Sequence, residues 1–224
     1  VNAPGTAQSP EFALGRVLAA LQNEDQLAEA ISAALVSGVP ESLASALKEW
    51  QATRRDAKKA PAATDKLNQA LASAPSTPVV DRIRAHAAHA GRKSRWILGH
   101  DAWAQDAGMG GVHHVIASRR NVNLLIFDTV PYSARDQVPL NERKKDIGLY
   151  AMNYGDTYVA STAIYSDYTQ VLHALMEADR FDGPSVVLAH LPCKDADAPA
   201  LDVLRETKLA VDSGYWPLFR DRKS

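Results

Sequence analysis

The chain has 224 residues, and its 25 Lys and Arg residues nearly balance 26 Asp and Glu residues, so the formal net charge is −1. This balance excludes the basic footprint typical of nucleic-acid or anionic-membrane binding. A single cysteine, Cys193, excludes an internal disulfide framework and any multi-cysteine zinc or iron–sulfur site.

Residues 1–90 are rich in alanine, with 23 of them, but hold only two of the 15 aromatic residues. Apolar residues at three-to-four spacing predict two helices on either side of a break at residues 23–25, and a third after Pro40. Residues 52–65 are charged and are expected to form a solvated connection. A short helix then ends at a break over residues 75–78, and another runs to Ala90. We interpret residues 1–90 as a helical segment packed on the main domain.

Residues 91–224 alternate between apolar, β-rich runs and helical stretches. The runs are residues 96–98, 122–127, 157–161 and 185–190, and the helices are expected over 103–118, 144–153 and 167–180. In the last helix, one apolar face is expected to comprise Tyr168, Val171, Leu172, Leu175 and Met176. Near-continuous apolar strands alternating with helices predict a three-layer α/β domain with a mainly parallel sheet and right-handed crossovers.

Ligands of such domains sit at the carboxyl ends of the strands. There, Asp101 follows the first strand and Thr129 follows the second. An acidic residue and a hydroxyl at neighbouring strand ends suit Mg²⁺, which prefers hard oxygen ligands. An Asp at a strand-to-helix junction is also a common helix N-cap, so the residue types alone leave both readings open.

A resemblance to a known family rests on several segments. They are Gly99-His100-Asp101-Ala102-Trp103, Gly108-Met109-Gly110-Gly111, Asp128-Thr129, Lys144-Lys145-Asp146 and the tail from Lys208 to Leu218. These segments resemble the thiamine-diphosphate domain of pyruvate:ferredoxin (flavodoxin) oxidoreductases. The similarity extends, less specifically, over the helical segment from residue 11 to about residue 71.

The resemblance implies a thiamine-diphosphate-binding fold whose cofactor is anchored through Mg²⁺. By family correspondence, the metal ligands are Asp101, Thr129 and the backbone carbonyl of Pro131. The implied cofactor-binding residues are Gly99, Asp101, Trp103, Thr129 and Tyr132. In the family, a partner domain supplies the activating glutamate, so no catalytic residue is expected in this chain and it should not be active alone.

Departures from the family pattern argue against a working site. The glycines that flank the aspartate are replaced by His100 and Ala102, and a Cβ at either position crowds the approach of a diphosphate. After Ser133 the family's asparagine and glycine pair are missing, and the loop over residues 134–143 is much shorter. We therefore expect no cofactor in this chain, with thiamine diphosphate and Mg²⁺ as the alternative.

Residues 141–155, 165–170 and 204–208 are similar to the hemoprotein β subunit of fungal-type assimilatory sulfite reductase (NADPH). This similarity implies a degenerate, non-catalytic domain that serves assembly or docking, with other domains of a parent polypeptide and a partner subunit as its partners. The alternatives are a functional cofactor half-site of a 2-oxoacid oxidoreductase and, third, a stand-alone partner-binding protein.

Three further expectations concern localisation and two residue types. Residues 1–6 lack a secretory signal and no apolar run spans a bilayer, so we expect a cytoplasmic protein with no membrane or nucleic-acid partner. Cys193 is expected to be a buried small residue rather than a nucleophile. The adjacent His113 and His114 point about 100° apart on a helix and so cannot share a metal.

Overall fold

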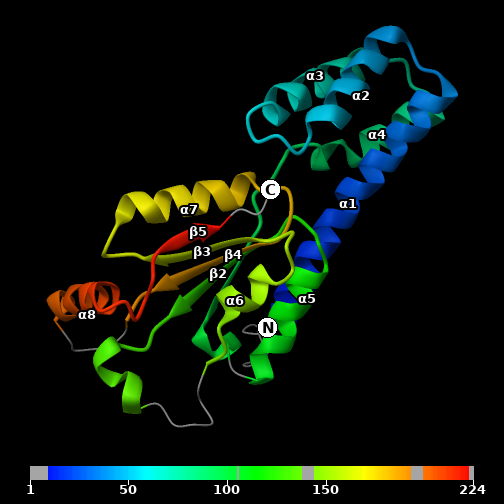
Figure 1. Ribbon diagram of the computed structural model, residues 1–224. Coiled ribbons are helices and arrows are strands. Elements are labelled where there is room, and N and C mark those ends of the chain that lie inside the picture. Colours follow the sequence, from blue (N-terminus) through cyan, green and yellow to red (C-terminus); the bar gives the residue numbers. More distant parts are fainter. Residues whose placement is uncertain (1–9, 105, 138–143, 193–198, 222–224) are drawn as a thin grey trace. The chain divides into compact units, whose positions relative to one another are not determined.

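A computed structural model describes residues 10–104, 106–137, 144–192 and 199–221. The chain divides into two compact units, one of residues 15–94 and the other of residues 1–14 with 95–224 (Figure 1). Each unit has a hydrophobic core of its own.

The unit of residues 15–94 is helical. It contains most of α1 (Pro10–Ser37), then α2 (Glu41–Thr53), α3 (Ala60–Ser73), α4 (Pro78–His86) and the 3₁₀ turn η1 (Ala87–His89). Its core is built from buried aliphatic side chains around Trp50. The Trp50 indole Nε1 donates a hydrogen bond to the carbonyl oxygen of Ala90 at 2.9 Å, which ties α2 to the end of the unit.

Two sequence predictions about this unit are wrong. Residues 23–25 do not break α1, because nothing there forces a non-helical backbone; α1 instead stops before Gly38, whose φ of 81° favours glycine. The expected connection over residues 52–65 is shorter than predicted, since α3 already begins at Ala60 with Pro61 in its first turn. The break before α4 is confirmed, and Thr77 caps that helix.

The other unit is an α/β domain with a five-stranded sheet. Its strands are β1 (Trp96–His100), β2 (Asn123–Asp128), β3 (Tyr158–Ala163), β4 (Ser185–His190) and β5 (Phe219–Asp221). They lie in the order β1-β2-β4-β3-β5, and only β5 is antiparallel to its neighbour. The four predicted strands and the mainly parallel α/β sheet are confirmed.

Helices cover both faces of this sheet. Gly148 of α6 (Ile147–Met152) packs on Leu188, whereas Ala174 and Ala178 of α7 (Tyr168–Arg180) share a cluster with Val187. Because successive strand residues point to opposite faces, α6 and α7 lie on opposite sides of the sheet. The remaining elements are α5 (Asp106–Ala117), α8 (Ala200–Asp212) and two 3₁₀ turns, η2 (Asp101–Ala104) and η3 (Tyr132–Gln137).

The predicted helix over 103–118 begins later, with α5, after the 3₁₀ turn η2, and the one over 144–153 is shortened to α6. The helix over 167–180 is confirmed as α7, but its expected apolar face is only partly buried. Leu175 packs against the core and Val171 is half-buried, as expected. Tyr168, Leu172 and Met176 are exposed, and the small residues Ala174 and Ala178 are buried against the sheet. The element α8 and the short β5 have no counterpart among the predicted elements.

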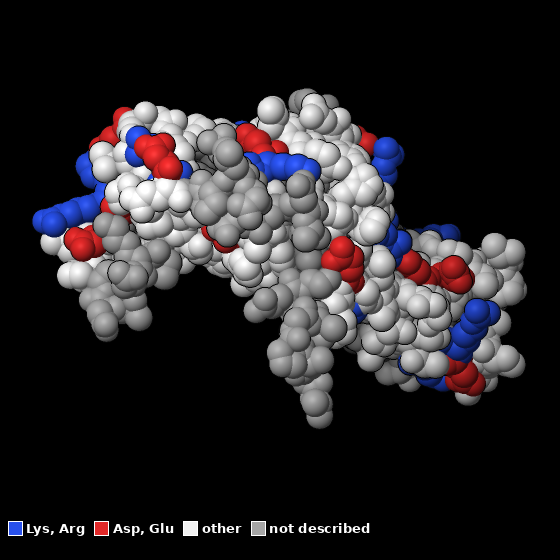
Figure 2. Space-filling model, turned by 90° about the horizontal axis from the view of Figure 1, so that it is seen from below, with Lys and Arg blue, Asp and Glu red and all other residues white. Residues whose placement is uncertain are grey.

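Figure 2 shows one face of the molecule, on which the coloured Lys and Arg side chains are interspersed with Asp and Glu rather than gathered by sign. This distribution fits the near-zero net charge. Among the helices of the described residues, none combines the length and the hydropathy that crossing a membrane requires.

Candidate functional site

Three parallel strands end side by side and bring their following residues together. Asp101 follows β1, Asp128 ends β2 with Thr129 directly after it, and His190 ends β4. In the sheet register His100 lies opposite Phe127, and Asp128 lies opposite His190. The parallel register therefore places polar side chains from three chain segments at one edge, as the strand pattern predicts.

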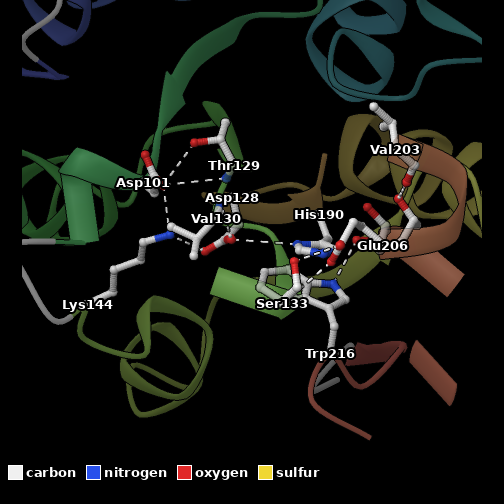
Figure 3. Close-up of polar contacts among 12 residues, drawn as sticks. Asp101, Asp128, Thr129, Val130, Ser133, Lys144, His190, Val203, Glu206 and Trp216 are labelled. Carbon is white, nitrogen blue, oxygen red and sulfur yellow. Dashed lines mark hydrogen bonds and ion pairs between the residues drawn. The ribbon is translucent and has the colours of Figure 1, made fainter. Parts of the chain in front are cut away.

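Lys144 points between the two carboxylates at this edge (Figure 3). Its Nζ lies 2.7 Å from Asp101 Oδ2 and 2.7 Å from Asp128 Oδ2. The side chains are only 19% exposed for Lys144 and 16% for each aspartate, so the ion pairs are partly shielded from solvent. The charge of this ammonium is thus shared by two acids that come from different strands.

Asp101 is the most heavily contacted of these acids. Its Oδ2 also accepts hydrogen bonds from the Thr129 hydroxyl at 3.0 Å and from the Thr129 amide at 3.4 Å. Burial disfavours the charged carboxylate, but the Lys144 ammonium and the Thr129 donors outweigh it and hold the pKa of Asp101 below its usual range. Asp101 is therefore an ionised, internally paired carboxylate.

The other two predicted metal ligands are also engaged within the chain. The Thr129 hydroxyl donates to Asp101, and the carbonyl oxygen of Pro131 accepts a hydrogen bond from the Ala134 amide at 3.0 Å. The Ala102 amide, next to Asp101, donates to Nδ1 of His100 at 3.3 Å. Polar groups that could face a bound ion or phosphate thus contact the protein itself.

The remaining predicted cofactor residues lie around this edge but make packing contacts. A Cβ built on Gly99 would come within 2.4 Å of the Trp103 indole, and Trp103 is itself buried. The Arg135 guanidinium lies over the Tyr132 ring at 4.0 Å, and the Tyr215 ring meets Tyr132 edge-on at 5.3 Å. Their predicted role in cofactor binding stays a prediction.

His190 is fully buried beneath the tail of the domain. Its ring stacks on Trp216 with a centroid distance of 4.9 Å, and its Nδ1 lies 3.6 Å from Asp128 Oδ1. Neither ring nitrogen has a hydrogen-bond partner among the described residues. Trp216 is fixed by its Nε1, which donates to the Thr162 carbonyl at 2.8 Å, so the aromatic tail packs on its own domain.

A second polar contact joins η3 to α8 (Figure 3). The nearly buried Glu206 carboxylate accepts hydrogen bonds from the Ser133 hydroxyl at 2.7 Å and from the Ser133 amide at 3.0 Å. These two hydrogen bonds fix Ser133, which by the family resemblance lies just before the loop that covers the cofactor.

A cavity of about 280 Å³ opens beside the ion pairs. Asp101, Asp128 and Lys144 line it together with residues of α6, β4 and the segment 215–219. Burial and the negative charge of Asp128 raise the pKa of the Tyr215 hydroxyl at its rim. The cavity is slightly smaller than the roughly 300–1,000 Å³ of typical small-molecule sites.

These residues do not fit the Mg²⁺ and thiamine diphosphate that the resemblance implies. Mg²⁺ requires oxygen ligands in a near-octahedral arrangement, but in this structure an ammonium lies against the Asp101 carboxylate. Within the described ranges, no group of three or more His, Cys, Asp or Glu side chains is arranged to hold a metal ion.

Sequence reasoning did not single out Lys144, Asp128, His190, Trp216 and Glu206 as members of one site. Asp128 and His190 had a signal, because each ends an apolar strand. Lys144 had a signal only through the family resemblance, which includes Lys144-Lys145-Asp146; by residue type alone, a run of basic residues is usually a solvated helix start. The Nδ1 of His113 lies 2.6 Å from the hydroxyls of both Tyr150 and Tyr154. Cys193 and residues 138–143 lie outside the described residues.

Comparison with curated proteins gives two groups of similar sequences. The chain is 63% identical over 127 residues to sulfite reductase [NADPH] subunit beta of Schizosaccharomyces pombe and 53% identical over 128 residues to that of Saccharomyces cerevisiae. Each match covers 57% of this chain and 9% of the relative. No family model matches the chain.

The second group matches over more of the chain at lower identity. Pyruvate:ferredoxin oxidoreductase of Moorella thermoacetica is 37% identical over 232 residues, which covers 94% of this chain and 20% of the relative. The chain thus spans about a tenth of the sulfite reductase subunits and a fifth of this oxidoreductase.

Proposed function

This chain is a homologue of the pyruvate:ferredoxin and pyruvate-flavodoxin oxidoreductases and of fungal sulfite reductase β subunits, and we propose that it is a non-catalytic domain of a larger protein. In this proposal the larger protein is a cytoplasmic, NADPH-dependent sulfite reductase. The domain keeps the thiamine-type fold, binds no thiamine diphosphate, and serves assembly or docking to other domains and a partner subunit.

The loss of cofactor binding is supported by one observation above the others. The three predicted metal ligands, Asp101, Thr129 and Pro131, all make polar contacts with the chain itself. His100 adds to this, because its imidazole accepts the Ala102 amide proton beside Asp101. A bound diphosphate would have to displace these internal contacts before gaining its own.

A docking role is supported by apolar side chains on the face of the sheet that carries α7. Tyr168, Leu172 and Met176 line the outer surface of α7, and Leu98 on the edge strand β1 is 60% exposed. Leu98 points to the same face of the sheet as Val187, on which α7 packs. Large exposed apolar residues are typical of a surface that another protein domain covers.

The test is a calorimetric titration of thiamine diphosphate with Mg²⁺ into the 224-residue chain. The proposal predicts no saturable heat with ligand in the millimolar range, for the chain and for Asp101→Ala alike. Micromolar binding that Asp101→Ala abolishes would contradict it. A melting curve of each protein confirms that the absence of heat does not reflect an unfolded sample.

A second candidate function is a working Mg²⁺ and thiamine-diphosphate half-site of a 2-oxoacid oxidoreductase. It is favoured by the retained pair of Asp101 and Thr129, whose side chains are 3.0 Å apart. On this alternative, the half-site binds the cofactor by itself, and a second α/β domain would only complete the active site. The same titration separates the two, since a half-site that binds alone gives a saturable heat.

A further inference from the structure

Three polar side chains outside the strand-end site meet between two helices. His113 lies in α5, Tyr150 lies in α6, and Tyr154 follows one helical turn later. The His113 Nδ1 is 2.6 Å from each of the two tyrosine hydroxyls, and the hydroxyls are 3.1 Å apart. The three polar atoms therefore form a closed triangle. All three side chains are half-buried, so the triangle is partly accessible to solvent.

Hydrogen bonds alone do not account for the three short distances. The imidazole Nδ1 accepts a hydrogen bond when it carries no proton and donates one when it does, but it cannot do both. Each tyrosine hydroxyl donates a single proton. At most two of the three contacts are therefore linear hydrogen bonds, and the third brings two polar atoms together with no proton aligned between them. A cation held by all three atoms would remove this mismatch.

We infer that the triangle is a binding site for a single ferric ion, held by the His113 imidazole nitrogen and by the phenolate oxygens of Tyr150 and Tyr154. Two ligands at right angles around a metal ion, each about 2.1 Å from it, lie about 3 Å apart. The separations of 2.6 and 3.1 Å are close to this value, so the three atoms need to move little. Among the described residues no three His, Cys, Asp or Glu side chains form a comparable group, and the phenol oxygens set this one apart.

The two phenols select a strongly Lewis-acidic ion. A phenol must lose its proton to become a metal ligand, and its ordinary pKa is about 10. The hydrogen bond with the Tyr150 hydroxyl raises the pKa of Tyr154 further. Mg²⁺ and Ca²⁺ prefer carboxylate and carbonyl oxygens, whereas iron accepts both imidazole and tyrosinate ligands. Ferric iron is therefore the ion that this set of side chains fits.

The experiment is a titration of ferric nitrilotriacetate into the 224-residue chain, followed by visible absorption. We expect a tyrosinate-to-iron charge-transfer band that saturates at one ion per chain. Iron bound by carboxylates or imidazoles alone gives no such band, so the signal reports phenolate ligation itself. The inference does not depend on the proposed function, because its residues are separate from those at the strand ends.

Single substitutions locate the bound ion. Tyr150→Phe, Tyr154→Phe and His113→Ala each remove one ligand, and each should weaken ferric binding at least tenfold and reduce the band. His114→Ala is the matched control for the imidazole, since it removes an exposed histidine whose ring is 5.7 Å from that of His113. Tyr168→Phe is the control for the phenols, because Tyr168 is exposed and pairs with another tyrosine ring. Both controls should keep the affinity and the band of the unaltered chain.

Two results overturn the inference. One is the absence of a visible band when the unaltered chain, shown by its melting curve to be folded, is titrated; this result needs no variant to fold. The other is a band that persists in a folded Tyr150→Phe and Tyr154→Phe double variant, checked by circular dichroism, which would place the iron on other tyrosines. Neither result bears on the proposed function, which the thiamine diphosphate titration tests separately.

Discussion

Gly99→Ala tests whether Gly99 is required for packing even when no cofactor is present. The added Cβ would lie 2.4 Å from three ring atoms of the Trp103 indole, well inside van der Waals contact. Trp103 is 5% exposed and its ring is rigid, so it has no room to move away. The clash must therefore be relieved by a shift of β1 or η2.

Inserting a methyl group into a close-packed site costs about 1–3 kcal/mol, and a contact this short with a ring belongs at the upper end, about 3 kcal/mol. For a domain of this size, 1 kcal/mol lowers the melting temperature by about 2–4 °C, so the expected loss is roughly 6–12 °C.

The assay is thermal unfolding of the 224-residue chain followed by circular dichroism, with Gly110→Ala as the matched control. Gly110 is an exposed residue of α5, and its added Cβ meets nothing within 4 Å. Alanine there should stabilise the helix by up to about 1 kcal/mol. If Gly99→Ala melts at the temperature of the unaltered chain, the packing explanation of Gly99 is refuted.

Three further predictions concern the ion pairs and the outer face of α7. Lys144→Met should destabilise the chain by about 2–3 kcal/mol, a cost between those of breaking an exposed and a fully buried ion pair. A double-mutant cycle with Asp101→Asn, measured by urea denaturation, should give a coupling energy of roughly 0.5–3 kcal/mol. Additive effects would show that the two side chains do not interact. Because the pKa of Asp101 is lowered on folding, its stabilising effect is present above about pH 4 and is lost as the pH falls through its lower folded-state pKa, so the stability advantage over Asp101→Asn should disappear in acid. Leu172→Gln should change the free energy of unfolding by no more than about 0.5 kcal/mol, because Leu172 is exposed. A loss above about 2 kcal/mol would place Leu172 in a core.

Most of the α/β sheet could be predicted from the sequence because apolar runs such as Ser185–His190 are long enough to mark buried parallel strands. The strand β5 could not, since Phe219–Asp221 is three residues long and pairs only at one edge. The buried face of α7 could be predicted only in part: Leu175 packs on the core, but Ala174 and Ala178 contact the sheet while Tyr168, Leu172 and Met176 remain outside. Hydrophobic periodicity identifies the most apolar face of a helix. It does not show where close contact between a helix and a sheet requires small residues.

The candidate site, like the fold, could be predicted from the sequence only in part. Asp101 and Thr129 follow strand ends that the sequence pattern marks clearly, so their proximity could be predicted from parallel pairing alone. Lys144 could not be placed, because its position depends on a backbone bond between Lys145 and Ala104, 41 positions apart. Nothing in a run of basic residues says which of them turns inward to two aspartates.

The measurement that tests the central claim most directly is a crystal structure of the 224-residue chain grown with Mn²⁺ and thiamine diphosphate, with anomalous diffraction recorded for the metal. We predict the Lys144 ammonium between Asp101 and Asp128, as in the present structure, and no anomalous peak between Asp101 and Thr129. A metal peak at about 2.1 Å from the Asp101 carboxylate, with Lys144 turned away and a diphosphate beside it, would contradict the account.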